Sequence, residues 1–162
     1  LGDVYKRQKE MSEQIDHDEN AVSIHVRRGD YLEPKYWKTT GCVCQLPYYL
    51  NAIAEMNKRI SQPSYYVFSD DIAWVKENLP LPKAFFIDWN KGTESWQDMM
   101  LMSRCRHHII CNSTFSWWGA WLNPRENKTV IMPERWFRHC ETPDICPDKW
   151  IKVPINQPDS IQ

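Results

Sequence analysis

Hydrophobic and polar positions along this 162-residue chain change period repeatedly, from alternation to helical spacing and back. Val22, Ile24 and Val26 alternate with polar neighbours, which predicts a strand. After Pro47 the apolar positions recur at helical spacing, and proline is favoured at a helix start, so a helix is predicted there. The whole pattern predicts strands over 21–26, 64–69, 84–88, 107–111 and 129–132, and helices over 47–60, 71–79, 94–105 and 114–122. Strict alternation of strands and helices indicates α/β architecture, a Rossmann-like parallel sheet flanked by helices.

Three regions fall outside this alternation. The polar start over residues 1–20 shows no sustained apolar period, and we expect it to be irregular. The connection over 33–46 contains proline, glycine and aromatic residues. Beyond Pro133 the chain is rich in proline and tryptophan, and we expect irregular packing over the sheet. The chain is therefore predicted to hold one α/β domain over 21–162, preceded by a polar segment.

Composition and charge argue against several kinds of binding partner, namely nucleic acid, anionic membranes and zinc. The net charge of −1, with acidic and basic residues nearly balanced, gives no support for a nucleic-acid-binding surface or an anionic membrane patch. No apolar run approaches the roughly 20 residues of a membrane span, and no signal peptide is visible. The six cysteines lack the spacing of a zinc site. We therefore expect reduced thiols in a cytoplasmic protein, with membrane association left open.

The strand over 21–26 runs directly into Arg27 and Arg28, and Gly29 follows. The carboxyl ends of parallel strands are the ligand-binding edge of such sheets, and glycine lets the backbone turn and approach a ligand closely. Two guanidiniums can each fork onto two oxygens, so the pair suits a diphosphate. The alternatives are a solvated charged surface and an adhesive loop, because Arg28-Gly29-Asp30 spells an adhesion tripeptide. A strand that leads straight into the motif argues against both.

A hydroxyl-rich segment begins at Asn112, directly after the fourth predicted strand. A helix start offers free backbone N–H groups and a partial positive charge to an anion. Ser113, Thr114 and Ser116 can donate hydroxyl hydrogen bonds to that anion, or they can simply cap the helix. Two such strand ends in one domain favour a shared pyrophosphate. Three tryptophans lie at helical spacing in the same helix, where we expect core packing in preference to sugar stacking: Trp117, Trp118 and Trp121.

Acidic residues are expected at the same edge. Asp98 lies in the predicted helix over 94–105, and its carboxylate can accept two hydrogen bonds from guanine N1–H and the exocyclic amine. A solvent-facing acid is the alternative. Asp70 and Asp71 end the second strand; Asp70 can contact nucleotide or ribose, and one of the two is expected to cap the next helix. Paired aspartates can also hold a metal ion, but the arginines already supply positive charge, so we predict no metal.

Three ordered blocks resemble the α-1,2-fucosyltransferases of glycosyltransferase family 11. They are His25 to Tyr31 (HVRRGDY), Phe68 to Trp74 (FSDDIAW), and Asp98 onward through the segment from Asn112 to Leu122. The first block is also similar to the donor-site motif of α-1,6- and protein O-fucosyltransferases. The resemblance implies a GT-B-type enzyme that transfers L-fucose from GDP-fucose to the 2-hydroxyl of a terminal galactoside, with inversion. It further implies a galactose-terminated glycan acceptor and no metal or other cofactor.

The resemblance also implies roles for single residues. Arg27 matches the catalytic arginine on the β-phosphate, where it stabilises the charge that builds on departing GDP, and Arg28 supports the site. The acceptor hydroxyl needs a base, and Asp30 and Glu33 are near in sequence without anything to fix either in position. The implied donor-binding set is His25, Arg27, Asp70, Asp98, Asn112, Ser113, Thr114 and Ser116.

Members of this family carry a second Rossmann-like half ahead of the His-x-Arg-Arg block, whereas the first predicted strand here already begins at residue 21. We therefore expect the chain to be the C-terminal, donor-binding half of such an enzyme. On this interpretation residues 1–20 are a remnant of, or linker from, the N-terminal half, and residues 21–162 form the GDP-fucose-binding domain. The alternatives are a non-catalytic GDP-sugar-binding module and a fucosyltransferase of different linkage.

Overall fold

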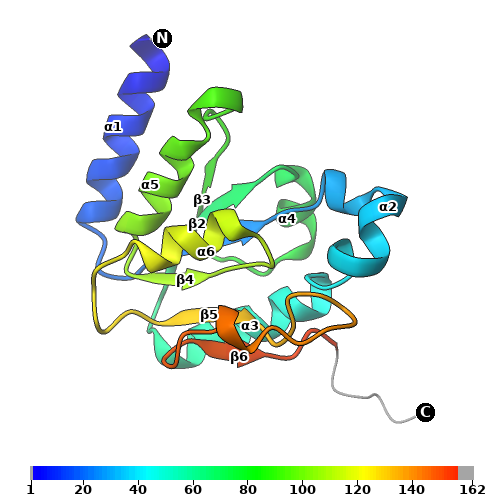
Figure 1. Ribbon diagram of the computed structural model, residues 1–162. Coiled ribbons are helices and arrows are strands. Elements are labelled where there is room, and N and C mark those ends of the chain that lie inside the picture. The colour runs from blue at the N-terminus through cyan, green and yellow to red at the C-terminus, as the bar shows by residue number, and fades with distance from the viewer. Residues whose placement is uncertain (1, 157–162) are drawn as a thin grey trace.

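Ala21–Val26 forms strand β1 inside the sheet, where it pairs in parallel with a neighbour on each side. In the computed structural model, which describes residues 2–156, the sheet has six strands in the order β3-β2-β1-β4-β5-β6, all parallel (Figure 1). The other strands are β2 (Ser64–Ser69), β3 (Ala84–Ile87), β4 (His107–Ile109), β5 (Val130–Pro133) and β6 (Ile151–Val153). The predicted α/β sheet is confirmed. Leu1 and residues 157–162 of the expected domain lie outside the described residues.

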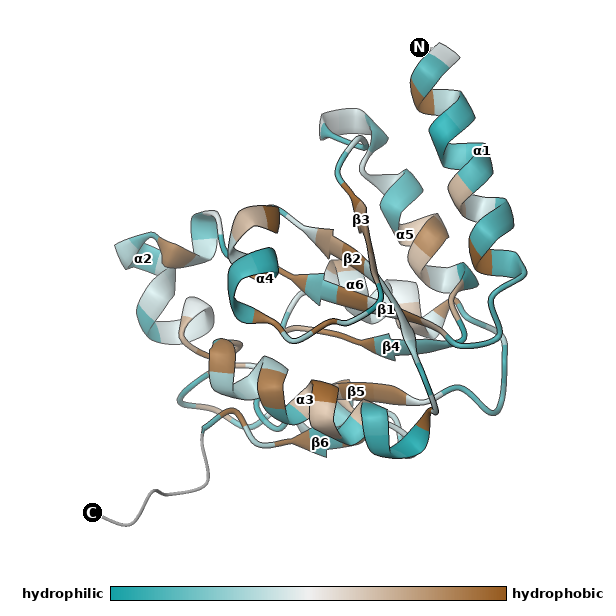
Figure 2. Cartoon of the chain, turned by 180° about the vertical axis from the view of Figure 1, so that it is seen from behind, coloured by the Kyte–Doolittle hydropathy of each residue, from teal (hydrophilic) through white to brown (hydrophobic). Residues whose placement is uncertain are grey.

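Helices cover both faces of the sheet, α3 and α4 on one face and α1, α5 and α6 on the other (Figures 1 and 2). Their bounds are α1 (Gly2–Asp16), α2 (Pro34–Tyr36), α3 (Leu46–Arg59), α4 (Ile72–Asn78), α5 (Trp96–Arg104) and α6 (Thr114–Trp121). Short 3₁₀ turns occupy Asp30–Leu32, Gly92–Glu94 and Pro143–Ile145, and a π-helical segment occupies Trp37–Gly41. No helix in the described part of the chain combines the length and apolarity needed to cross a bilayer.

The alternation in β1 explains the two layers. Val22, Ile24 and Val26 are fully buried and pack in one cluster with residues of α3 and α4. Ala21 points to the opposite face and packs with Leu101 of α5 and other residues of that layer. Successive side chains of a strand point to opposite faces, so the same backbone supplies both cores.

Two expectations about the ends of the chain are wrong. Residues 1–20 are not irregular, because most of them form α1, whose Ile15 is fully buried in the core against β1, β2 and α5. The tail beyond Pro133 is not wholly irregular either, because Ile151–Val153 adds β6 to the edge of the sheet beside β5. Both elements owe their structure to tertiary packing, which a local pattern of polar residues or three strand residues does not reveal.

The tryptophans of α6 divide between core and surface. Trp117 is half-buried, stacks on Trp121 at a ring distance of 5.3 Å and donates its indole N–H to the Ile145 carbonyl at 2.8 Å. Trp118 and Trp121 are 47% and 50% exposed. The prediction of core packing is therefore correct in part for Trp117 and wrong for the other two, because one face of α6 has no covering element among the described residues.

A buried polar network joins the middle of the sheet. Ser23 of β1 lies opposite His108 of β4, and the hydroxyl oxygen is 2.7 Å from His108 Nδ1. On the other side of the ring, Asn123 Nδ2 donates to His108 Nε2 at 2.9 Å. An accepting Nε2 requires a neutral imidazole, which then donates from Nδ1 to Ser23. Burial lowers the pKa of His108 to about 3, in agreement with a neutral ring.

We expect acid to destabilise this fold through the fully buried His108 and the partly buried His25, whose pKa values both lie at about 3 in the folded chain. In the unfolded chain a histidine titrates near 6.5, so the unfolded state binds the proton more readily. The contribution of the two neutral histidines to the unfolding free energy is therefore fully present above about pH 7. It falls by about 1.4 kcal/mol per pH unit for each histidine as the pH drops below 6.5. Asp98, with a pKa raised to about 6, acts in the opposite sense and offsets part of the slope.

Urea denaturation between about pH 7 and pH 5 measures this slope. His108→Gln removes one of the two histidines, so the slope is expected to fall by about 1.4 kcal/mol per pH unit. His17→Gln is the matched control, because His17 is exposed and lies outside the buried network. An equal slope in wild type and His108→Gln would contradict the prediction.

The strand order places a topological switch point beside the most central strands. After β3 the chain returns past β2 and β1 to begin β4 on the other side of β1. Connections therefore diverge between β1 and β4, and ligands of open α/β sheets bind outside the carboxyl ends of strands at such a switch point. Arg27 directly follows β1 at this edge.

Candidate functional site

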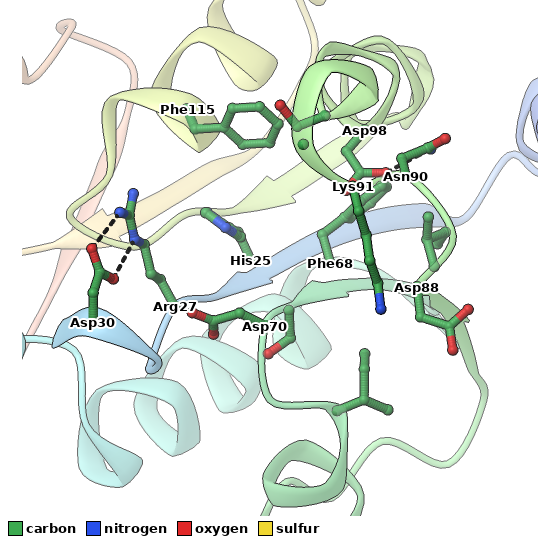
Figure 3. A pocket seen from close by; sticks show the side chains of 15 residues that line it. His25, Arg27, Asp30, Phe68, Asp70, Asp88, Asn90, Lys91, Asp98 and Phe115 are labelled. Carbon is green, nitrogen blue, oxygen red and sulfur yellow. Dashed lines mark hydrogen bonds and ion pairs between the residues drawn. The ribbon is translucent and has the colours of Figure 1, made fainter. Parts of the chain in front are cut away.

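A cavity of about 730 Å³ opens at the carboxyl edge of the sheet, beside the ends of β1, β2 and β3 (Figure 3). Its volume lies within the range of small-molecule sites. The lining residues are His25, Arg27, Asp30, Phe68, Ser69, Asp70, Ile72, Ile87, Asp88, Asn90, Lys91, Gly92, Ser95, Asp98 and Phe115. Figure 3 shows Arg27 and Asp30 at one end and Asp98 and Asn90 at the other. A guanidinium and a carboxyl group therefore lie at opposite ends of the cavity.

Arg27 is held at one end by three contacts. Its Nε and Nη2 donate to Asp30 Oδ1 and Oδ2 at 3.3 and 2.9 Å, and its Cζ lies 4.6 Å from the centre of the Tyr31 ring. The Tyr31 hydroxyl in turn donates to the Asn112 carbonyl at 3.0 Å, which ties the turn after β1 to the end of β4. Hydrogen bonds to Asp30 raise the pKa of Arg27, so the guanidinium is charged. This end of the cavity presents a fixed cation.

Asp70, at the end of β2, shapes the turn that carries Arg27. Its carboxylate accepts the backbone N–H groups of Arg28 and Gly29, each at 2.8 Å. A Cβ on Gly29 would lie 2.6 Å from Asp70 Oδ2, so a larger residue here would displace the carboxylate that holds the turn. Asp71 caps α4 by accepting the Trp74 N–H at 3.1 Å, as expected for one member of the acidic pair.

The two arginines point in different directions. Arg28 does not line the cavity; its Nε donates to Asp71 Oδ2 at 3.3 Å and its Cζ lies 4.1 Å from the centre of the Trp74 ring. Its side chain is only 14% exposed. The expected pair of guanidiniums on one ligand is therefore split, with Arg27 in the cavity and Arg28 against α4. The resemblance also implies Arg28 as a second catalytic residue that supports Arg27. This role stays a prediction, which the geometry limits to support of the turn.

His25 forms part of the cavity wall between the two ends. Its Nδ1 lies 3.3 Å from Cys111 Sγ, and its ring centre is 5.7 Å from that of Phe115. Burial, together with the charge of Arg27, lowers the pKa of His25 to about 3. The imidazole is therefore neutral, and it presents a polar ring beside the aromatic rings of Phe68 and Phe115.

Asp98 stands at the other end, in the first turn of α5. Asn90 Nδ2 donates to its Oδ1 at 2.8 Å. Burial raises the pKa of Asp98 to about 6, and the hydrogen bond from Asn90 opposes this rise. The carboxyl is therefore mostly ionised at neutral pH and becomes protonated in mild acid.

The chain matches one known family over most of its length. Residues 5–153 match the model of "Glycosyl transferase family 11". The chain belongs to this family. It is 38% identical over 149 residues to an α-1,2-colitosyltransferase of Escherichia coli, covering 90% of this chain and 51% of the relative. It is 34% identical over 111 residues to galactoside α-(1,2)-fucosyltransferase 1 of Ateles belzebuth, covering 66% of this chain and 30% of the relative.

Solved structures share the fold at lower sequence identity. Fucosyltransferase NodZ from Bradyrhizobium superposes with a TM-score of 0.55 at 19% identity, over 82% of this chain and 44% of that chain. NodZ α-1,6-fucosyltransferase co-crystallised with GDP gives 0.53 at 17% identity, over the same shares of both chains. The family 11 chain spans about half the length of its first curated relatives, 51% and 45%.

Four polar residues of the hydroxyl-rich segment of this family 11 chain, Asn112, Ser113, Thr114 and Ser116, do not line the cavity. Asn112 is buried and donates to the carbonyls of Thr40 and Trp136 at 2.9 and 3.0 Å, so it fastens loops together. Ser113 makes no side-chain capping bond to α6, and its buried hydroxyl has no partner among the described residues. Ser116 is buried and donates to the Ser113 carbonyl at 3.4 Å, while Thr114 is exposed. Contact of these four residues with a diphosphate stays a prediction.

Four of the predicted donor residues of this family 11 chain do meet around one cavity, namely His25, Arg27, Asp70 and Asp98. Two further residues of the cavity wall, Phe115 and Asn90, were not predicted from the sequence. Asn90 is the third residue after β3, so the rule that residues after strand ends contact ligands could have found it. Phe115 gave no separate signal, because an aromatic residue in the first turn of a helix is typical of core packing.

Proposed function

We propose that this chain binds the GDP-linked sugar of a transferase that moves L-fucose to the 2-hydroxyl of a terminal galactoside. The observation that carries the proposal is one cavity with the Arg27 guanidinium at one end and the Asp98 carboxyl at the other. Membership of the family and its α-1,2-fucosyltransferase and α-1,2-colitosyltransferase relatives support the reaction class.

The two ends of the cavity match the two ends of GDP. Guanine carries two adjacent donors, N1–H and the exocyclic amine, and an ionised Asp98 can accept both. The partly exposed Phe115 offers apolar surface to the base between the polar ends, whereas Phe68 is buried in the cavity wall. The diphosphate carries the negative charge that Arg27 can bind through forked hydrogen bonds.

The reaction breaks the bond between fucosyl C1 and the β-phosphate oxygen, and the electron pair leaves with GDP. The acceptor 2-hydroxyl oxygen forms the new bond to C1 from the opposite side and loses its proton to a base. Arg27 is placed to stabilise the negative charge that grows on GDP, which is where a fixed cation lowers the barrier most. We propose that this charge serves in place of a metal ion. Asp30, whose pKa the Arg27 contact lowers, is a weak base in this arrangement.

Calorimetric titration of the 162-residue chain with GDP, GDP-fucose and ADP, in the presence of a chelator, tests the donor site. We expect GDP and GDP-fucose to bind and ADP to bind at least about tenfold more weakly, because adenine lacks the N1–H donor and leaves Asp98 unpaired. Binding that needs added divalent metal would contradict metal independence. Equal affinity for GDP and ADP, in a chain shown to be folded, would contradict the placement of guanine at Asp98.

A second donor deserves the same titration, because one relative is an α-1,2-colitosyltransferase at 38% identity. GDP-colitose would place a colitosyl group where the first proposal places fucose. A difference of about tenfold between GDP-fucose and GDP-colitose identifies the preferred donor. Incubation with the preferred donor and lactose then tests transfer, and binding without transfer would favour the non-catalytic module.

A further inference from the structure

Four side chains form a hydrogen-bonded network behind Asp98. Asn90 Nδ2 donates to Asp98 Oδ1 at 2.8 Å and to Gln8 Oε1 of α1 at 2.9 Å. The Trp89 indole N–H donates to the same Gln8 oxygen at 3.3 Å. Gln8 Nε2 donates to the backbone carbonyl of Gln97, on α5, at 3.1 Å. The network therefore links the N-terminal helix to the guanine end of the cavity.

The donors and acceptors of this network determine how both amides are oriented. The indole N–H of Trp89 can only donate, so the Gln8 atom that receives it is the oxygen, and Gln8 Nε2 is left to donate to a carbonyl. Asn90 then lies between two acceptors, Gln8 Oε1 and the carboxylate of Asp98, so the atom it places there is Nδ2. A rotated Asn90 amide would put oxygen against oxygen at both contacts. Gln8 thus selects the orientation in which Asn90 donates to Asp98.

Asn90 is well placed to act on the carboxylate of Asp98. It is only 7% exposed, and its own carbonyl oxygen is buried without a partner among the described residues. Asp98 Oδ1 is fixed by the Asn90 donor, and each carboxylate oxygen can accept more than one hydrogen bond. The plane of the carboxylate is therefore set while both oxygens can still receive the adjacent N–H groups of a guanine.

The position of α1 is fixed along its length. Near its C-terminal end Asp16 accepts from Arg104 of α5, with 2.9 Å between Oδ1 and Nε, and the neighbouring Ile15 is fully buried. Nearer the start, Gln8 contacts both the α5 backbone and Asn90. Figure 1 shows the two helices side by side. Gln8 is therefore presented to the network by a docked helix and not by a loose terminus.

We propose that Asn90, oriented by Gln8, is a positioning residue that holds Asp98 ionised and aligned for guanine, so that α1 helps to set nucleotide selectivity. The inference rests on the proposed function, because it assumes that Asp98 reads the base. Asn90 stabilises the ionised carboxylate, whereas burial disfavours it. Loss of the Asn90 donor therefore shifts the protonation of Asp98 to higher pH. The pH at which GDP affinity is lost should rise with it.

The experiment is GDP titration of wild type, Asn90→Leu and Gln8→Leu between about pH 5.5 and 8.5. Wild type should lose GDP affinity around the pKa of Asp98, about 6. The midpoint is the pH at which half of the GDP affinity is lost. In Asn90→Leu this midpoint should rise by about one pH unit, because a hydrogen bond to a charged group is worth at least a tenfold change in protonation. Gln8→Leu, which frees Asn90 to rotate, should move the midpoint in the same direction by less. IDP, which lacks the exocyclic amine, should be discriminated less well by both variants.

A matched control comes from the same helix. Gln14 also donates from α1, to the Tyr66 hydroxyl at 3.3 Å, but it does not line the cavity or contact the network. Gln14→Leu should therefore leave the midpoint and the GDP-to-IDP ratio unchanged. The other ionisable groups of the cavity remain in every variant, so differences between variants report on Asp98. These groups are His25, Arg27, Asp30, Asp70, Asp88 and Lys91.

The outcomes separate the two proposals. A folded wild type that does not bind GDP overturns the proposed function and this inference with it. A wild type that binds GDP, with Asn90→Leu and Gln8→Leu both showing the midpoint of Gln14→Leu, overturns the inference alone. If Asn90→Leu fails to fold, Gln8→Leu decides, because its side chain lies outside the cavity lining.

Discussion

Arg27→Ala is expected to weaken GDP binding at least about hundredfold while changing the unfolding free energy by no more than about 1 kcal/mol. The variant removes the charged donors that face the diphosphate, and each hydrogen bond to a charged group contributes about 1.5–3 kcal/mol. It also leaves the Asp30 carboxylate unpaired beside a ligand of the same charge. The fold loses little, because the Arg27–Asp30 pair is substantially exposed, at 36% and 42% of the two side chains.

Two further variants apportion this loss. Arg27→Ala with Asp30→Asn removes the repulsion, so it should recover part of the affinity that Arg27→Ala loses. Arg28→Ala is the matched arginine control, because its guanidinium packs on Trp74 and lies outside the cavity lining. It should cost more stability and less GDP affinity than Arg27→Ala. Calorimetry with GDP and urea denaturation provide both quantities, and equal affinities of the two arginine variants would contradict the split described above.

Gly41→Ala should destabilise the fold by about 3 kcal/mol or more. An added Cβ would lie 1.8 Å from the carbonyl oxygen and 2.7 Å from the carbonyl carbon of Tyr31. Both partners are backbone, so no side-chain rotation relieves the overlap, and the π-helical segment Trp37–Gly41 must move away from residue 31. GDP affinity should fall as well, because Tyr31 packs under the Arg27 guanidinium and bonds to Asn112.

Urea denaturation measures the loss, with Gly2→Ala as the control. A Cβ on Gly2 meets nothing within 4 Å, so that variant should retain wild-type stability. Gly92→Ala has equally open surroundings but a positive φ of 59°, so it should cost about 1 kcal/mol through backbone strain alone. If Gly41→Ala costs no more than Gly92→Ala, the close contact with Tyr31 is not the constraint that the structure indicates.

The alternation of apolar and polar residues in β1 predicts which face each side chain points to, as well as the strand itself. It places Val22, Ile24 and Val26 on one face, and the structure confirms this. Continued by two residues, the same alternation separates Arg27 from Arg28, because neighbouring side chains of an extended chain point to opposite sides. Arg27 then joins the face of His25, and Arg28 joins the face covered by α4. The expectation of a paired site overlooked this period.

The helical state of α1 and the role of Asn112 could not be predicted from local sequence patterns. Figure 2 shows α1 as largely hydrophilic, and Ile15 is its one fully buried side chain, so its helical state depends on docking against α5. Asn112 looked like a ligand residue because it follows a strand and is polar. Its amide instead satisfies two backbone carbonyls from distant loops, Thr40 and Trp136, which no sequence spacing could indicate.

The central place of β1 has a consequence for how the chain folds. β1 lies next to β2, which follows it closely in sequence, but its other edge is closed by His107–Ile109, more than eighty residues later. Parallel pairing over such a separation is slow, because the entropy of closing the intervening loop is lost before the contacts form. During synthesis on the ribosome β1 therefore has one edge of unpaired backbone N–H and C=O groups, between apolar side chains, until β4 emerges. The strand that carries Arg27 to the cavity is therefore exposed to aggregation while the chain is incomplete.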